Sequence, residues 1–292
     1  MFRLGGPDVH PGAGRAGRGG GGLNCGPMIL PSVSPAHWLL SLGAALAYAV
    51  PALAASRIGA ERGRAALWVA WVLHAAVLAW GLLGSVPRFG FAPALSMTAW
   101  LVLTVYAIEH QVFPQMRTRW MLAALGAAAV LLAQVFPGQP LHVNASAWLP
   151  LHLALGIASY GLFAAAVVHA WLMTRAERRI RLAADPRSGV PLLTLERLTF
   201  RFVVAGFVLL TATLAAGLFF GETLYGRAWN WDHKAVFSVL SWLTFAVLLI
   251  GRSRFGWRGR SAVRVLYAGA GLLLLAYVGS RFVLEVVLGR SL

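Results

Sequence analysis

The chain has 292 residues, of which 59% are hydrophobic and only 12% charged, and its net charge is +16. A soluble domain of this length carries more charge on its surface, so the composition favours an integral membrane protein. The positive charge does not indicate nucleic-acid binding, because the basic residues fall in short runs between apolar segments. The single cysteine, Cys25, excludes an internal disulfide, a CxxC redox pair and a cysteine-rich metal site.

Residues 1–27 form a glycine- and arginine-rich tail with little apolar sequence. Such a segment buries too little apolar surface to offset the entropy of ordering, so we expect it to be disordered. It also lacks the apolar core of a signal peptide. Leu23-Asn24-Cys25 bears a faint resemblance to a lipid-attachment site, but the preferred interpretation is that Met28 is the true start. The membrane domain is then predicted over residues 28–292.

Eight apolar segments follow the tail, and they are candidates to span the hydrocarbon core of about 30 Å, which needs roughly 20 helical residues. Prolines and glycines separate several of them, as in Pro137-Gly138-Gln139-Pro140 between the fourth and the fifth. The predicted fold class is therefore all-α, a polytopic membrane helix bundle of about eight transmembrane helices. The predicted spans are residues 36–55, 66–84, 91–108, 120–136, 149–173, 202–221, 235–250 and 265–288.

The basic residues predict the orientation of these helices. Most of the 25 lysines and arginines fall in the first, third, fifth and seventh connections, and few fall in the others. By the positive-inside rule these four connections are cytoplasmic, so both termini and the even-numbered connections lie outside. The basic residues of the odd-numbered connections are Arg57, Arg62, Arg64, Arg117, Arg119, Arg175, Arg178, Arg179, Arg181, Arg187, Arg197, Arg201, Arg252, Arg254, Arg258, Arg260 and Arg264.

The connection between the sixth and seventh spans has an unusual composition. Trp229 and Trp231 stand beside Asp232, His233 and Lys234, which combines flat aromatic faces with both signs of charge. Tryptophan at a membrane interface is commonly an anchoring residue, and this interpretation stays open. The alternative is an outward-facing shelf that holds a planar, amphiphilic ligand.

Two histidines within apolar segments are further candidates, because ionisable groups at membrane depth are costly and often functional. His152 lies about one turn into the fifth span, on a face that it shares with Gly156 and Ser159. His74 lies in the middle of the second span. For each, hydrogen bonding to a neighbouring helix is an equally open interpretation. His169, deeper along the fifth span, is interpreted as structural.

Enzyme signatures are absent from the sequence. It contains no HExxH, GxSxG or phosphate-binding glycine loop, and only nine acidic residues in all. We therefore favour a protein that performs no bond chemistry itself and assign no catalytic residue.

The C-terminal half resembles the cytochrome c assembly family, whose CcsA-like membrane proteins carry a tryptophan-rich WWD segment on the outer side. The resemblance rests on residues 151–161, Glu196 to Arg201, Trp229 to Lys234 and Ser241-Trp242. Within the family, His233 together with residues 256–260 and 277–285 is most similar to the YpjD branch, akin to HemX.

The resemblance implies non-covalent binding of haem b, with His152 as an axial ligand of the iron and His74 or His233 as a second candidate. Trp229, Trp231 and Asp232 match the WWD segment and would contact the haem. The sequence departs from the family pattern near Ile250 and Leu288, where further histidines are expected and none follows His233.

These expectations give two alternative functions. The first is a haem-binding accessory factor that presents or senses haem at an outward-facing loop. The second is a haem-free scaffold or transporter accessory that keeps the fold. Expected partners are membrane lipid, haem and other cytochrome c maturation or membrane proteins, and the expected location is the bacterial inner membrane.

Overall fold

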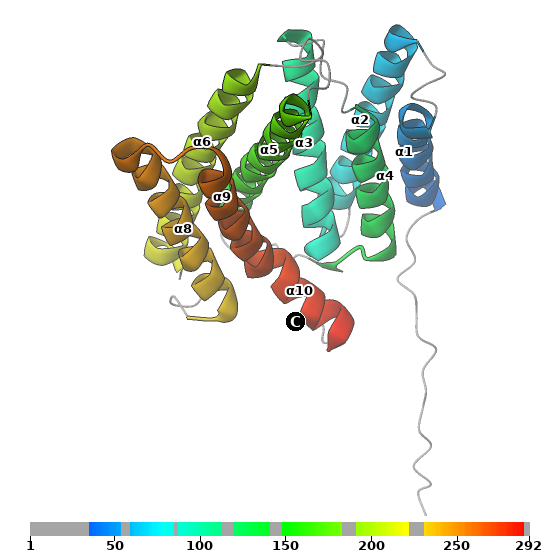
Figure 1. The fold of residues 1–292 in the computed structure, drawn as a ribbon. Helices are drawn as coiled ribbons and strands as arrows, with labels where there is room; N and C mark the ends of the chain where they lie inside the picture. Colours follow the sequence, from blue (N-terminus) through cyan, green and yellow to red (C-terminus); the bar gives the residue numbers. More distant parts are fainter. Residues whose placement is uncertain are drawn as a thin grey trace, which may run out of the picture. The chain divides into compact units, whose positions relative to one another are not determined.

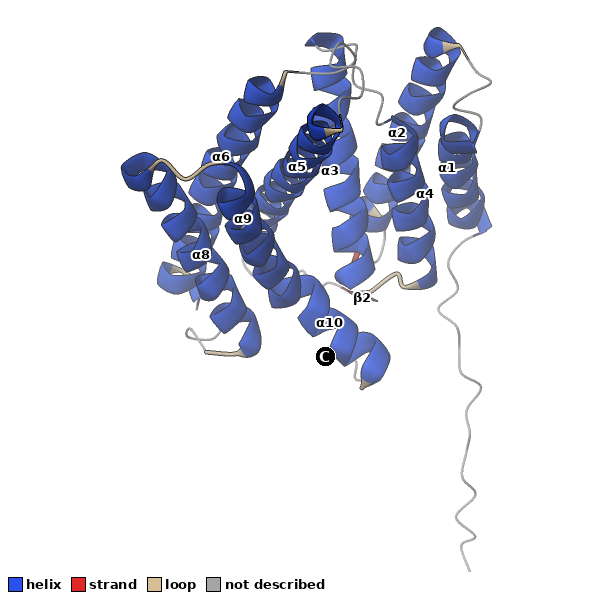
Figure 2. Cartoon of the chain, viewed as in Figure 1, coloured by secondary structure: helices blue, strands red, loops and turns tan. Residues whose placement is uncertain are grey.

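The computed structural model describes residues 35–53, 59–84, 87–112, 119–140, 148–182, 191–221 and 231–288. Residues from Pro35 onward belong to one compact unit. The predicted tail 1–27, Met28 and Trp229 lie outside the described residues. Helices make up nearly all of the described chain, as Figure 2 shows.

Seven helices are long and apolar enough to cross a membrane, and α4 is a shorter apolar helix. The predicted all-α polytopic membrane bundle of about eight helices is thus confirmed, and each predicted span coincides with a helix. The helices are α1 (Pro35–Leu53), α2 (Ala60–Leu83), α3 (Phe91–Val112), α4 (Arg119–Val135), α5 (Leu149–Arg181), α6 (Leu192–Phe219), α8 (His233–Phe255) and α9 (Gly259–Leu274), which continues through η1 (Leu275–Gly279), α10 (Ser280–Phe282) and η2 (Val283–Val287).

Successive helices run in opposite directions through the bundle. Helices α2, α4, α6 and α9 begin at the end drawn at the top of Figure 1, and α3, α5 and α8 begin at the other end. Basic residues gather at the end of the bundle where α2 begins and where α5 and α8 end. Examples are Arg64 in α2, Arg178 in the last turn of α5 and Arg252 in the last turn of α8. We call this the arginine end, and the opposite end, where α5 and α8 begin, the shelf end.

Several helices extend beyond the spans predicted from the sequence, and α5 and α6 together change the predicted connection between them most. The fifth span was predicted to end at residue 173 and the sixth to begin at residue 202, with a basic connection between them. In the structure α5 continues to Arg181 and α6 already begins at Leu192. A hydropathy criterion stops at charged residues, yet Arg, Ala, Glu and Leu all favour helix, and α5 and α6 pack against each other. Much of the predicted basic loop is therefore helical.

The bundle core is apolar, with close contacts where helices cross. The rings of Phe163 on α5 and Phe245 on α8 stack with their centroids 3.8 Å apart. Gly206 of α6 faces the Phe163 ring, and an added Cβ there would stand 3.2 Å from it. Small residues that let helices approach closely are the usual means of packing in a membrane, where apolar surface alone does not drive helices together.

A short antiparallel pair of strands lies at the shelf end. β1 (Arg88–Phe89) precedes α3, and β2 (Gln139–Pro140) follows α4. Gly138 adopts a positive φ of 78°, and a Cβ there would lie 2.6 Å from the backbone of Phe89. Only glycine fits this position, so the contact between the two segments depends on it.

Candidate functional site

The beginning of α5 places His152 at the shelf end. Trp148 is the N-cap of the helix, and its carbonyl accepts a hydrogen bond of 3.1 Å from the backbone N–H of His152. His152 therefore lies in the first turn of α5, and its side chain is half-buried. Trp148 is 64% exposed. The sequence analysis did not single out Trp148, although its position directly before an apolar helix parallels that of Trp231.

The helix face below His152 packs against α6. A Cβ added to Gly156 would meet Cγ2 of Thr213 at 3.7 Å, an ordinary van der Waals distance. Ser159 is fully buried, and its hydroxyl donates to the Gly156 carbonyl at 2.7 Å. The small residue below His152 thus accommodates a neighbouring helix.

The beginning of α8 presents Trp231, Asp232 and His233. One carboxylate oxygen of Asp232 accepts a hydrogen bond of 2.9 Å from the N–H of Ala235, which caps the helix. An acidic side chain at this position satisfies a free N–H and interacts favourably with the helix dipole. Trp231 is 67% exposed, and His233 is also exposed, in the first turn.

The candidates at the beginnings of α5 and α8 therefore lie at the same end of the bundle. Figure 1 shows both helix starts at the shelf end. His152, Trp231, Asp232 and His233 belong to this group, whereas Trp229 lies outside the described residues. We call His152, Trp148, Trp231, Asp232 and His233 the shelf residues.

His74 is enclosed elsewhere, in the middle of α2. Its side chain has no exposed surface. Nδ1 lies 3.1 Å from the hydroxyl of Tyr48 on α1, and Nε2 lies 2.8 Å from the hydroxyl of Ser96 on α3. Both ring nitrogens are engaged, so binding of a metal by His74 would break one of these hydrogen bonds.

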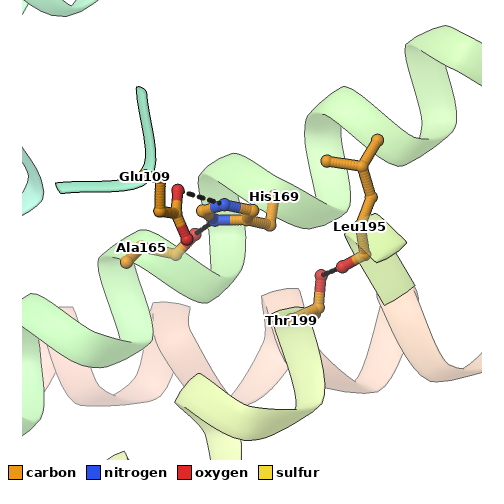
Figure 3. Close-up of polar contacts among 5 residues, drawn as sticks. All are labelled: Glu109, Ala165, His169, Leu195 and Thr199. Carbon is orange, nitrogen blue, oxygen red and sulfur yellow. Dashed lines mark hydrogen bonds and ion pairs between the residues drawn. The ribbon is translucent and has the colours of Figure 1, made fainter. Parts of the chain in front are cut away.

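A further buried polar pair joins α3 to α5, as Figure 3 shows. Nε2 of His169 lies 2.8 Å from Oε2 of Glu109, and Nδ1 lies 2.7 Å from the Ala165 carbonyl. The two residues are only 3% and 7% exposed. His169 thus makes contacts within the bundle, and one of them is to the Glu109 carboxylate, which was not predicted from the sequence.

The hydrogen bonds limit how many protons this pair holds. A carbonyl only accepts hydrogen bonds, so Nδ1 of His169 must donate to Ala165. A second proton must then lie between Nε2 and Oε2, because two lone pairs do not form a hydrogen bond. The pair therefore holds one shared proton and is neutral overall, either as acid and imidazole or as carboxylate and imidazolium.

The sequence carried a weak signal for this pair. Glu109 directly follows the predicted span 91–108 and is the one acidic residue of α3, and His169 is a second imidazole on the helix of His152. An isolated acid in such a segment is costly and normally has a partner. The signal does not identify the partner, because 60 residues separate the two.

Comparison with known proteins places this arrangement in context. The family described as Cytochrome C assembly protein matches residues 63–288. Inner membrane protein YpjD of Escherichia coli (strain K12) is 34% identical over 175 residues, which are 58% of this chain and 66% of that protein, just under two thirds. No solved structure matches the chain.

Two other relatives extend the comparison. An uncharacterized 28.8 kDa protein from the nifR3-like 5′ region of Azospirillum brasilense is 32% identical over 247 residues, covering 79% of this chain and 89% of that protein. Cytochrome c biogenesis protein CcsA of Prochlorococcus marinus subsp. pastoris is 26% identical over 180 residues, covering 60% of this chain and 54% of that protein.

Proposed function

This chain belongs to the cytochrome c assembly protein family and is similar to YpjD and CcsA, and from that membership we propose that it handles haem during cytochrome c assembly. It presents or senses haem at the shelf end and makes or breaks no bonds in it. The observation that carries the proposal is the common position of His152 and the 67% exposed Trp231 at the starts of two helices at one end of the bundle.

The shelf residues suit a flat, apolar ligand that carries a metal. A half-buried imidazole in the first turn of α5 provides an axial ligand for haem iron, and exposed indole faces provide contact area for the macrocycle. When bound, haem supplies iron with axial positions for imidazole. His152 would bind the iron, and the exposed His233 is the preferred second residue to bind it.

His74 is the weaker candidate for the second axial position. Its two nitrogens already contact Tyr48 and Ser96, so a bond to iron requires a rearrangement between α1, α2 and α3. Trp229 remains part of the proposed haem contact by its match to the WWD segment. The sequence contains no CxxCH, which makes the proposed binding of haem b non-covalent.

The proposed location is the bacterial inner membrane, with the arginine end in the cytoplasm and both termini outside. Clustered arginines at one end of the helices support this orientation. Reporter fusions after Arg187 and Arg260 should report cytoplasm, and fusions after Asn144 and at the C-terminus should report the outside. A cytoplasmic C-terminus would overturn the orientation.

The haem proposal is tested by the absorption spectrum of the protein purified in detergent after expression with ample haem. We expect a Soret band in the wild type, and we expect His152→Ala to lower or shift it, with partial restoration by added imidazole. His233→Ala tests the second axial position, and His74→Ala tests the alternative to it. A wild type without bound haem would instead favour a haem-free scaffold, which is consistent with the missing histidines near Ile250 and Leu288.

A second comparison separates ligand contact from membrane anchoring at the tryptophans. Trp231→Ala should reduce retained haem at least several-fold, while Trp80→Ala should leave it unchanged. Trp80 is a suitable control because it is 51% exposed and lies near the end of α2 that is also at the shelf end. Equal effects of the two substitutions would favour the anchoring interpretation.

A further inference from the structure

A cavity of about 140 Å³ lies between α1, α2 and α3 at the arginine end. It is separate from the shelf residues, because its lining comes from α1, the first half of α2 and the second half of α3. An apolar cavity of about 150 Å³ is known to accept benzene. The space therefore admits a single ring or a short length of acyl chain, but not a macrocycle such as haem. Its lining includes Tyr48, Arg64, Trp68, Trp71, Tyr106 and His110.

The aromatic wall of the cavity is held in place by its own contacts. The indole N–H of Trp71 donates to the hydroxyl of Thr104 at 2.8 Å, and its ring stacks on Trp100 with centroids 4.9 Å apart. Trp68 packs edge-on against Trp71 at 5.6 Å. These contacts within the protein hold the apolar surface in place, so binding there costs little ordering.

The polar part of the cavity lining includes His110 and Arg64. Nδ1 of His110 is buried and has no hydrogen-bond partner among the described residues, while its ring stacks on Tyr106. Arg64 adds a guanidinium to the same lining. That nitrogen has almost no accessible surface, so the group that a ligand in the cavity meets directly is the Arg64 guanidinium. This arginine selects an acidic group, since guanidinium pairs favourably with phosphate and carboxylate.

The surroundings of the cavity indicate how such a ligand arrives. Trp68 is 47% exposed on α2, one of the helices that cross the membrane, so this side of the cavity faces lipid. We propose that the cavity binds an anionic amphiphile of the membrane. Its phosphate or carboxylate pairs with Arg64, and its first methylene groups pack against Trp68 and Trp71.

Native mass spectrometry of the detergent-solubilised protein tests this proposal with three probes: dioleoyl phosphatidylglycerol, oleate and dioleoyl phosphatidylcholine. We expect the protein to retain one molecule of an anionic probe, phosphatidylglycerol or oleate. Retention of the zwitterionic phosphatidylcholine should be at least tenfold weaker. Retention of phosphatidylglycerol alone assigns a phosphate as the natural head group, and retention of oleate alone assigns a carboxylate.

Arg64→Gln provides the decisive variant, and Arg62→Gln is its matched control. Both arginines are exposed on the first turns of α2, but only Arg64 lines the cavity. Arg64→Gln should reduce retention of the anionic probe about tenfold, and Arg62→Gln should leave it unchanged. Trp68→Ala should weaken retention of the anionic probe, but the protein should still retain it more tightly than phosphatidylcholine. Equal losses in the two arginine variants, or equal retention of all three probes, would overturn the proposal.

Discussion

The two histidines enclosed by the bundle differ in what surrounds them. His74 contacts two neutral hydroxyls, from Tyr48 and Ser96, on the helices before and after its own. His169 contacts a backbone carbonyl of its own helix and the carboxylate of Glu109. Both lie in apolar segments of similar appearance, so their sequence surroundings alone do not distinguish them.

The difference shows that depth in the membrane does not determine the role of an imidazole. A histidine between two hydroxyls needs no extra proton, because hydroxyl groups both donate and accept. A histidine that donates to a carbonyl and faces a carboxylate must share a proton with it. Removing a partner should therefore cost far more at His169 than at His74, and this comparison can be tested.

The largest effect is expected for Glu109→Leu. This change leaves His169 buried without its acidic partner, and where the pair is carboxylate and imidazolium, removing one member costs about 3–5 kcal/mol. Thermal unfolding of the detergent-solubilised protein measures the loss. The double variant Glu109→Leu/His169→Leu should recover much of it, since an apolar pair replaces a polar one. A double variant as unstable as the sum of the two single ones would show that the pair is not coupled.

An intermediate effect is expected for His74→Leu. The hydroxyls of Tyr48 and Ser96 would then be buried without the imidazole, at a cost of about 1–3 kcal/mol. The same unfolding measurement applies, with His74→Gln as the control, because an amide can still bond one hydroxyl. If His74→Leu destabilises the protein as much as Glu109→Leu, the contrast between the two sites is wrong.

A smaller effect is expected for Ser96→Ala. His74 keeps its contact with Tyr48 and loses only the 2.8 Å bond from Nε2, worth about 0.5–1.5 kcal/mol. The variant also frees Nε2, so added haem should bind more readily at His74 if that residue is a second axial ligand. An unchanged absorption spectrum in Ser96→Ala would remove His74 from the proposed haem ligands.

The smallest effect is expected for Glu109→Gln. The amide N–H can donate to Nε2 of His169 in place of the shared proton, so the loss should stay below about 1 kcal/mol. The comparison with Glu109→Leu then separates the hydrogen bond from the charge. A loss as large as that of Glu109→Leu would mean that the charged form of the pair is essential to the fold.

The sequence by itself determined the number, order and approximate limits of the helices. Each segment of about 20 apolar residues became a helix, because a membrane leaves no other way to satisfy the backbone of a single spanning segment. It also placed His152 near the beginning of one helix, and it placed the Trp231–His233 group in the connection before another helix, which in the structure already begins at His233. The family resemblance, drawn from the same residues, was confirmed by comparison with known proteins.

Only the tertiary structure decided which faces of the helices meet. Helix α2 shows why, because Val69 and Val72 are exposed while Ala70 and His74 are fully buried, and little in the sequence separates them. Lipid and protein interior are both apolar, so the pattern of hydrophobic residues does not orient a membrane helix as it does a helix in water. The pairs His169–Glu109 and His74–Tyr48 follow from helix rotation and packing, which depend on contacts across the whole bundle.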